Sequence, residues 1–419
     1  MRVLLVNTSE HTGGASVAAG RLLDALNGNG VKAKMLVTRK TSDRPTVVGL
    51  PAAWRYQASF YAERLAIWTL NGFRRDHLFD VDPAWTGVDI TRLPEFREAD
   101  VIHLHWINQG MLSLGGLRRI LRTGKPVVWT LHDMWPFTGV CHYARECKKW
   151  RTGCHHCELL LHGGGAHDMS ATTFRRKATA YAGARLSFVA CSHWLAGLAA
   201  ASPLTAGHDV ASIPNPICTR RFRPGDKTAL RRRLGLPVDR KLILFVAYKV
   251  TSPLKGVGYL CEALGRLAAS HPEVRDSWQL VAVGREADSL AGRVPVPVTA
   301  VDYVSTEAGM MDYYRAADVL AMPSLHDNLP NTIAEAMACG MPCVGFDVGG
   351  LPQMIDHRQN GYLAAYRDSE DFARGLLDTL HPVHYAERQA AARRKAEHTY
   401  SESAVAGAYI DVYEKLLNT

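Results

Sequence analysis

Two carboxylates separated by eight positions stand in the stretch "SLHDNLPNTIAEAMACGMPCVGFDVGG". Asp327 lies in a Pro/Asn-rich loop, and Glu335 lies about one turn into the helix that we expect to begin after it. A carboxylate accepts two hydrogen bonds, which matches the vicinal diol of a ribose or hexose. Between the acids, the N–H groups of Asn331 and Thr332 at the helix start suit a phosphate. The pattern predicts a site for a phosphorylated sugar; the alternative is a polar loop followed by a surface helix.

Two lysines stand in a comparable position earlier in the same half of the chain. In "FVAYKVTSPLKG", Lys249 and Lys255 flank a short polar loop that follows an expected strand, and a helix is expected from about Gly256. Two ammonium groups beside a helix N-terminus suit a diphosphate. The alternative is a pair of solvated surface lysines.

The first half of the chain carries its own candidates at strand ends. The expected first strand ends at Asn7, and the loop after it holds Gly13 and Gly14 before a helix. Glycines let a backbone approach a ligand closely, and the helix start favours an anion. The spacing is not GxGxxG, so a dinucleotide-binding loop is only weakly indicated. A plain strand-to-helix turn is the alternative.

Histidines follow two further expected strands. "DVIHLHW" places His103 and His105 on the same side of one strand end, and "VVWTLHD" places His132 and Asp133 at another. A lone histidine at a strand end is usually a hydrogen-bonded structural residue. Three at neighbouring strand ends favour a site somewhat more.

The strands and helices that must position these residues are indicated by short apolar runs that alternate with helical patterns. This alternation predicts two doubly wound parallel sheets in tandem, with ligands at the carboxyl ends of the strands. "IPNPICTRRFRPGDK" between the two series is a plausible hinge. The expected strands are 3–6, 34–37, 101–104, 127–131 and 187–190 in the first series, and 242–247, 278–284, 298–304, 318–324 and 342–348 in the second. The expected helices are 17–26, 256–268, 307–317, 333–339 and an amphipathic 401–417.

Composition narrows the class of protein. The chain has 419 residues, 47% of them apolar, which is enough for two or three well-packed domains. The formal net charge of +9 suits phosphorylated ligands, an anionic membrane face or nucleic acid, but no basic run with interleaved aromatics supports the last. No apolar run is long enough for a membrane span or, at the start, a signal peptide. Nine mostly scattered cysteines favour a reduced cytoplasm, so we expect a cytoplasmic protein.

Four cysteines gather in "CHYARECKKWRTGCHHC", at Cys141, Cys147, Cys154 and Cys157. Four thiolates suit tetrahedral zinc, and the CxxC half has the spacing of a zinc knuckle, although the first pair is irregular. We expect a structural zinc clip and no catalytic metal. Nearby His142, His155 and His156 are possible substitute ligands. Disulfides and free thiols are the alternatives.

An aromatic and basic stretch runs from Trp54 to Arg75. It fits an interfacial helix that docks the protein at the inner membrane face near a lipid-linked acceptor. An ordinary amphipathic core helix is the favoured interpretation, because aromatic side chains are usually buried.

Taken together, these motifs resemble the retaining glycosyltransferases of family 4, over nearly the whole chain. The acid-x7-acid pair "DNLPNTIAE", the two lysines six apart, "GGAS", "TLHD" and the "IPNPICTRRFRP" segment carry the resemblance. It implies the GT-B fold: two facing Rossmann-like domains with an interdomain cleft, one over 1–216 and one over 217–400, with a C-terminal helix 401–419 packing back on the first. Within the family, the chain is most similar to bacterial polysaccharide-assembly members.

The resemblance also implies roles for the candidates. Glu335 would hold ribose hydroxyls and Asp327 the donor sugar, while Lys249 and Lys255 would neutralise the leaving diphosphate. Further contacts to phosphate, sugar or acceptor would come from Gly13, Gly14, His105, His132, Asn331 and Thr332. The implied donor is a UDP- or GDP-linked sugar, and the implied acceptor is a saccharide or lipid-linked saccharide.

The chain departs from the family pattern at two positions. Asp327 stands where Glu is usual and reaches one methylene less far, which leaves the identity of the donor sugar open. Pro330 stands where Gly is usual and has no N–H to donate. Separately, Asp80-Val81-Asp82 resembles the metal-binding DxD of another glycosyltransferase fold. It follows no clear buried strand, so we interpret it as a solvated turn.

Overall fold

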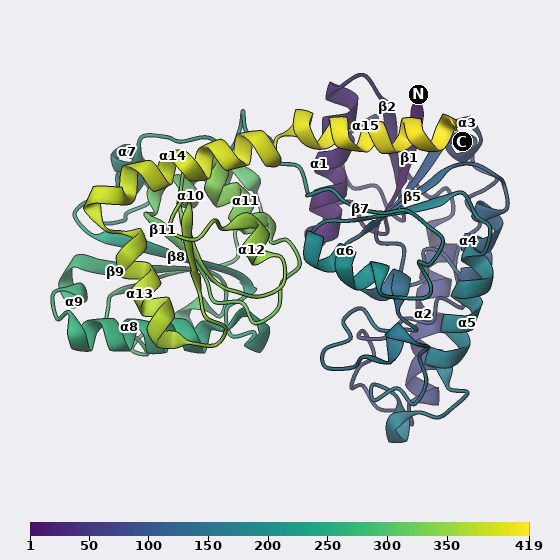
Figure 1. Ribbon diagram of the computed structural model, residues 1–419, viewed down its shortest axis with the longest axis horizontal. Helices are drawn as coiled ribbons and strands as arrows, with labels where there is room; N and C mark the ends of the chain where they lie inside the picture. The colour runs from purple at the N-terminus through teal and green to yellow at the C-terminus, as the bar shows by residue number, and fades with distance from the viewer. Residues whose placement is uncertain (419) are drawn as a thin grey trace. The chain divides into compact units, whose positions relative to one another are not determined.

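The computed structural model describes residues 1–418, which form two compact units (Figure 1). Unit 1 comprises Met1–Pro216 and the chain from Val405 onward, and unit 2 comprises Ile217–Ala404. Each unit is a doubly wound α/β domain with a fully parallel sheet. The predicted pair of doubly wound parallel sheets is therefore confirmed.

Unit 1 is built on a seven-stranded sheet in the order β3-β2-β1-β4-β5-β6-β7. Because β1 has β2 on one side and β4 on the other, the strand order reverses between β1 and β4. Its strands are β1 Arg2–Val6, β2 Lys32–Val37, β3 Val47–Gly49, β4 Val101–Leu104, β5 Val127–Leu131, β6 Leu186–Ala190 and β7 Val210–Ser212. Its helices are α1 Gly14–Gly28, α2 Ala53–Leu70, α3 Pro94–Glu98, α4 Leu114–Leu121, α5 Met169–Tyr181, α6 His193–Ala200 and nearly all of α15 Glu402–Asn418.

Successive side chains along the strands of unit 1 pack into two separate hydrophobic cores, one on each face of the sheet. In β1, Val3 and Leu5 pack with α1 and α15, whereas Leu4 and Val6 pack on the opposite face with α4, α5 and α6. Successive strand side chains point to opposite faces, so a strand covered on both sides must be apolar throughout. This explains the continuous apolar runs that the sequence shows.

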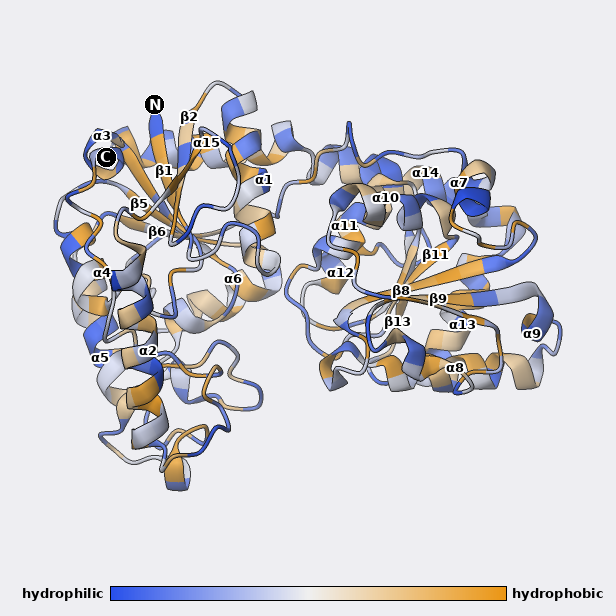
Figure 2. Ribbon diagram, turned by 180° about the vertical axis from the view of Figure 1, so that it is seen from behind, coloured by the Kyte–Doolittle hydropathy of each residue, from blue (hydrophilic) through white to orange (hydrophobic). Residues whose placement is uncertain are grey.

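Unit 2 has a six-stranded sheet in the order β10-β9-β8-β11-β12-β13, which reverses between β8 and β11. Its strands β8 and β9 are strongly hydrophobic (Figure 2) and bury Ile243, Phe245, Leu280 and Ala282 against α8 and α13. The strands are β8 Lys241–Lys249, β9 Trp278–Arg285, β10 Val298–Val301, β11 Val319–Met322, β12 Cys343–Phe346 and β13 Gly361–Ala364. The helices are α7 Lys227–Arg233, α8 Val257–Ser270, α9 Val274–Ser277, α10 Glu307–Ala316, α11 Asn331–Ala338, α12 Leu351–Met354, α13 Ser369–Thr379 and α14 Pro382–Thr399.

The C-terminal helix α15 is fastened to the sheet of unit 1 by two buried tyrosines. The Tyr413 hydroxyl lies 2.6 Å from Nδ1 of His103, and the Tyr409 hydroxyl lies 2.8 Å from Oγ1 of Thr130. Oγ1 of Thr130 also lies 2.7 Å from Nε2 of His103. His103 is thus a structural residue inside β4 that links the sheet to α15.

Helix α2 corrects one expectation from the sequence. The favoured amphipathic core helix is wrong, because α2 buries Glu63, Arg64 and Ile67 and leaves Trp54 and Tyr61 exposed to solvent. No helix among residues 1–418 is long and apolar enough to cross a membrane.

The interpretation of Asp80-Val81-Asp82 as a solvated turn is also wrong for two of its three residues. Val81 and Asp82 are fully buried. Oδ2 of Asp82 accepts a 2.7 Å hydrogen bond from the Gln109 N–H and lies 3.3 Å from the Arg64 guanidinium. Asp82 therefore anchors α2 to the body of unit 1.

Candidate functional site

The predicted site residues of unit 2 lie at or after the ends of β8 and β11, the two strands between which the sheet order reverses. In doubly wound sheets, ligands bind outside the carboxyl ends of the strands at this point. Lys255 follows β8 and Asp327 follows β11, and the Lys255 ammonium lies 2.7 Å from Oδ2 of Asp327. The structure thus brings one lysine and one acid of the predicted set into direct contact.

Glycines hold the two loops that carry this pair. Gly256 adopts φ 65° at the start of α8, and a Cβ there would overlap the carbonyl oxygen of Pro323 at the end of β11. Gly349 adopts φ 60°, and a Cβ there would overlap the carbonyl oxygen of Asp327. The Gly350 N–H donates to that same oxygen at 3.1 Å. The "DVGG" loop therefore supports the backbone of Asp327 directly.

Lys249 is placed differently from Lys255. It ends β8, is about half exposed, and its ammonium lies 2.8 Å from Oε1 of Glu286 after β9. Glu286 adopts a left-handed backbone conformation with φ 62° and also accepts a hydrogen bond from the Thr251 hydroxyl. Although Glu286 is thus a close partner of a predicted site residue, nothing in its local sequence marks it.

The helix α11 presents the remaining candidates of unit 2. Pro330 precedes its first turn, so the N–H groups of Asn331 and Thr332 lie at the helix start, where the helix itself offers them no carbonyl partner. Within the described residues, the Thr332 hydroxyl is buried without a hydrogen-bond partner. An orphaned buried hydroxyl is costly. The Thr332 hydroxyl lies at a helix N-terminus, a position that favours the binding of phosphate.

Glu335 is buried in α11 and held by a residue that the sequence reasoning missed. The Tyr314 hydroxyl, from α10, donates a 2.6 Å hydrogen bond to Oε2 of Glu335. Tyr314 is almost fully buried, so it fixes the orientation of the carboxylate. It lies 21 residues before Glu335, a separation at which no local pattern could have linked the two.

In unit 1, the candidates gather where β1 and β4 end, again at the reversal of strand order. Asn7 follows β1, and its amide binds Ser16 in α1 at 3.0 Å and the Trp106 N–H after β4 at 3.0 Å. Gly13 precedes α1 with φ 89°, and Gly14 is its first residue. Asn7, whose role the sequence did not reveal, thus fixes the glycine loop relative to β4.

A row of three histidines lies beside this loop. The rings of His103 and His105 stack with centroids 4.3 Å apart, and Nδ1 of His105 lies 3.0 Å from Nε2 of His132. On its other side, Nδ1 of His132 lies 3.6 Å from Sγ of Cys191, which donates to Oδ1 of Asn215 at 3.2 Å. Because the Cys191 proton points to Asn215, the Nδ1–H of His132 donates to the sulfur and its Nε2 accepts from His105.

All three histidines are neutral at physiological pH. Burial lowers the pKa of His103 to about 3 and that of His132 to about 4, and burial lowers the pKa of His105 well below its usual value. With its Nδ1–H directed at His132, His105 is left with a bare Nε2, which is buried without a partner among the described residues. The row therefore acts as a set of fixed hydrogen-bonding groups and carries no charge.

Asp133 and His142 form a charged pair next to His132. Oδ2 of Asp133 lies 2.7 Å from Nδ1 of His142 and accepts from the Trp106 indole at 3.0 Å. Although burial opposes both charges, the His142 charge lowers the pKa of Asp133, and the Asp133 charge raises the pKa of His142. His142 is thus a partner of Asp133, a role that the sequence reasoning did not assign to it.

The zinc site predicted for the cysteine segment stays a prediction. No group of three or more His, Cys, Asp or Glu side chains within residues 1–418 is arranged to hold a metal ion. Cys141, Cys147, Cys154 and Cys157 are free thiols. Cys141 and Cys154 face the buried Lys177, whose ammonium donates to the carbonyls of Trp135, Thr138 and Gly139 at 2.5 to 3.1 Å. In this structure the loop is held by Lys177 and core packing.

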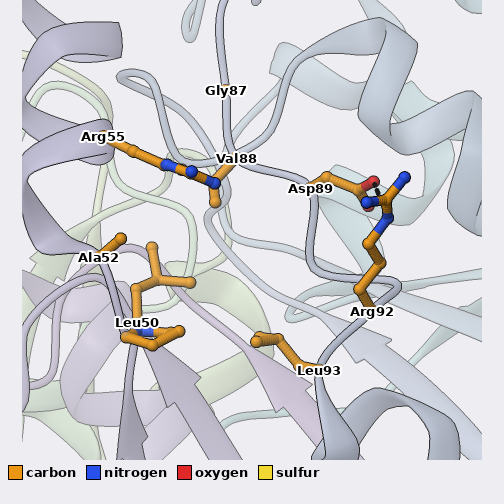
Figure 3. A pocket seen from close by; sticks show the side chains of 9 residues that line it. Leu50, Ala52, Arg55, Gly87, Val88, Asp89, Arg92 and Leu93 are labelled. Atoms are coloured by element: carbon orange, nitrogen blue, oxygen red, sulfur yellow. Dashed lines mark ion pairs between the residues drawn. The ribbon is translucent and has the colours of Figure 1, made fainter.

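One further pocket lies in unit 1, with a volume of about 330 Å³ (Figure 3). None of the predicted site residues lines it. Leu50, Val88 and Leu93 supply apolar walls, while Arg55, Asp89 and Arg92 supply charge. Since Asp89 already pairs with Arg119 and Arg92, the pocket does not present a free set of charges.

Comparison with solved structures identifies the fold. The chain aligns over its full length with a sucrose-phosphate synthase from Thermosynechococcus elongatus, covering 99% of that chain, with a TM-score of 0.69 and 17% identity. It aligns over 99% of its length with all of Anabaena HepE, solved with UDP, with a TM-score of 0.64 and 16% identity. The two parallel-sheet domains and these likenesses show the GT-B fold.

Sequence comparison finds relatives over part of the chain. A D-inositol 3-phosphate glycosyltransferase 2 from Catenulispora acidiphila is 35% identical over 223 residues, which are 49% of this chain and 50% of that protein. A D-inositol 3-phosphate glycosyltransferase from Geodermatophilus obscurus is 35% identical over 180 residues, 40% of this chain and 39% of that protein. The matched part thus spans half or less of these curated relatives.

Family models match both units. The model described as "Glycosyl transferases group 1" matches residues 240–381, within unit 2. The model described as "Glycosyltransferase Family 4" matches residues 12–221, half of the chain, and covers the glycine loop and the histidine row. The chain belongs to glycosyltransferase family 4.

Proposed function

We propose that this protein is a retaining, metal-independent glycosyltransferase that moves a sugar from a nucleotide-diphosphate sugar to a saccharide or lipid-linked acceptor. The observation that carries the proposal is the Lys255–Asp327 pair, placed where the sheet order of unit 2 reverses. A cation and a hydroxyl-binding carboxylate in contact suit a ligand in which phosphate and sugar are adjacent. Family membership supports the same assignment.

The donor is assigned to unit 2. The α11 N-terminus and the unpartnered hydroxyl of Thr332 offer hydrogen bonds to a phosphate, and the Lys255 ammonium offers a positive charge. Glu335 keeps acceptor capacity for ribose hydroxyls while Tyr314 holds one of its oxygens. HepE is solved with UDP and with UDP-glucose, which favours a UDP-linked donor over a GDP-linked one.

In the proposed reaction, these groups stabilise a leaving diphosphate. As the bond between sugar and phosphate lengthens, negative charge grows on the phosphate oxygens, and fixed N–H dipoles and an ammonium stabilise that charge. In a reaction with retention, the departing phosphate takes the proton of the acceptor hydroxyl on the same face of the sugar. No protein nucleophile is then required.

Unit 1 is assigned to the acceptor and to the transferred sugar. The glycine loop at Gly13 and Gly14 lets a ligand approach the α1 backbone closely. His132 is held in one tautomer between His105 and Cys191. Assembly of a bacterial polysaccharide is the process that we propose for the product.

Incubation with a panel of UDP-, GDP- and ADP-linked sugars tests the proposal. Release of free nucleotide that depends on an acceptor, with the anomeric configuration of the product retained, is the expected result. Formation of an altered sugar nucleotide without acceptor would indicate an epimerase. Tight binding of a donor without any turnover across the panel of acceptors would indicate a sugar-binding or scaffold protein.

A further inference from the structure

Helix α2 and the turn that follows it carry an exposed apolar surface, here called the α2 face. Trp54, Tyr61 and Leu65 are 67%, 68% and 57% exposed, and Leu70, Phe73 and Phe79 are 58%, 65% and 56% exposed. Six large apolar side chains within 26 residues of sequence are unusual on a protein surface in water, where scattered single ones are the norm.

The orientation of α2 makes this exposure a fixed property of the fold. Arg64 donates to the carbonyl of Leu78 at 2.5 Å and lies 3.2 Å from Oε1 of Glu63, which is itself fully buried. Oε2 of Glu63 accepts from the Trp85 N–H at 2.7 Å. Rotating the helix to bury its apolar side chains would break these bonds and expose their partners. The helix therefore holds these two polar side chains inward and its large apolar residues outward.

Spacing along α2 gathers Trp54, Tyr61 and Leu65 into one stripe. Trp54, Tyr61 and Leu65 stand at positions i, i+7 and i+11, which share one side of an α-helix. Ala58, also exposed, lies between them on the same side. Leu70, at the end of the helix, lies on another side of α2, and the turn after it exposes Phe73.

The charges around the α2 face indicate which partner covers it. The exposed charged residues of segment 53–79 are Arg55, Arg74, Arg75 and Asp76, so positive charge predominates. A second copy of the chain on the same face would bring these arginines toward their own equivalents, because a twofold interface joins identical patches. A partner with negative charge at its surface and an apolar interior beneath it suits both the arginines and the exposed apolar side chains. Trp and Tyr side chains, with an apolar body and a polar tip, are suited to such a boundary.

We propose that the α2 face docks this protein on an anionic phospholipid bilayer, with Trp54, Tyr61 and Leu65 inserted at the headgroup boundary. This inference does not depend on the proposed transfer reaction, since none of these residues belongs to either candidate site. The sequence suggested a membrane-docking helix between Trp54 and Arg75, and the proposal names the side chains of that segment that enter the lipid.

Co-sedimentation of the full-length protein with lipid vesicles tests the inference. We expect the protein to pellet at low salt with vesicles of phosphatidylglycerol and phosphatidylcholine and to remain in solution with phosphatidylcholine alone. Changing Tyr61→Gln and Leu65→Gln together should weaken binding about tenfold or more, since both side chains lose their apolar contact with the lipid. High salt should weaken binding as well, because the arginines act through screened charge.

A matched variant separates the α2 face from exposed apolar residues in general. Val238 and Val383 are 50% and 74% exposed in unit 2, so Val238→Gln with Val383→Gln removes comparable apolar surface elsewhere. This control should bind vesicles like the unchanged protein. Absence of binding at low salt, or equal losses in both variants, would overturn the proposal. So would light scattering that shows a dimer which only the α2 variant dissociates, because the face would then join two copies.

Discussion

The Lys255 ammonium and Oδ2 of Asp327 lie 2.7 Å apart and join the loops that follow β8 and β11. Both side chains remain partly exposed, and a pair of this kind contributes only about 0–1 kcal/mol to stability. The pair is therefore poorly explained as a structural element. A ligand that carries phosphate beside sugar hydroxyls could take up the positive charge of Lys255 and the hydrogen-bonding capacity of Asp327 together.

Changing Lys255→Ala should lower the rate of sugar transfer about 100-fold or more, the usual effect of removing one group that stabilises developing negative charge. Lys395→Ala is the matched control, since the Lys395 ammonium pairs with Asp356 at 2.6 Å elsewhere in unit 2. Circular dichroism should show both variants folded, and steady-state kinetics should separate them. Normal turnover by Lys255→Ala would remove that lysine from the proposed role.

Tyr314→Phe should weaken nucleotide binding about fivefold to tenfold, because one neutral hydrogen bond that orients Glu335 contributes on the order of 1 kcal/mol. The rate at saturating donor should change little, since the hydroxyl contacts Glu335, which we assign to the ribose and not to the transferred sugar. Calorimetric titration with UDP measures the effect. Glu335→Gln should weaken binding further, and an unchanged UDP affinity in both variants would exclude the assignment of Glu335 to the ribose.

Gly349→Ala should destabilise the loop that supports Asp327 and reduce donor affinity. A Cβ there would overlap the Asp327 carbonyl oxygen, and φ 60° is unfavourable for alanine. Gly292→Ala provides the control, because Gly292 has φ 74° but no atom lies within 4 Å of the position that an alanine methyl would take there. Both variants carry the backbone strain, so melting temperature should drop in both. Only Gly349→Ala should also lose donor affinity.

The sequence predicted most of the sheet because buried parallel strands are continuous apolar runs. The strands Val101–Leu104 and Val127–Leu131 were predicted at their observed limits. The predicted strand 298–304 ends earlier, at Val301, because Asp302 and Tyr303 are exposed. The edge strands β3 and β7 were missed, since three residues give too little pattern to detect. The edge strand β13 was missed as well, because it begins with Gly361, and glycine is depleted in strands.

Most of the candidate residues were located in the sequence by their place in the loops that follow strands. Lys255, Asp327, His105 and His132 could be found in this way. Tyr314 could not, because its bond to Glu335 is a tertiary contact between α10 and α11. The failure at α2 has a related cause: aromatic residues were expected to be buried, but the tertiary anchors of Glu63 and Arg64 set which side of the helix faces inward.

The histidine row should show no titration between pH 5 and 8. Burial lowers the pKa of His132 to about 4, and the native state therefore binds fewer protons than the unfolded state between pH 4 and about 6.5. Stability should accordingly fall as pH decreases through that range. Nitrogen-15 NMR should find His132 as the Nδ1–H tautomer. His105→Leu should lose that preference, whereas His105→Asn, which keeps a donor, should retain more of it.

Glu63→Gln should make the protein's stability less dependent on pH. Burial and the neighbouring Asp82 charge raise the pKa of Glu63 to about 8, compared with about 4.5 in an unfolded chain. Between those values the native state holds a proton that the unfolded state has released, so stability falls as pH rises from about 4.5 to about 8. Glutamine cannot ionise and removes this loss, which we place on the order of 2–4 kcal/mol. Denaturant unfolding at several pH values measures the effect, with Glu98→Gln, an exposed glutamate of unit 1, as the control. If Glu63→Gln and the unchanged protein lose stability in parallel up to pH 8, then Glu63 is already ionised in the native state and its charge is fully compensated by Arg64.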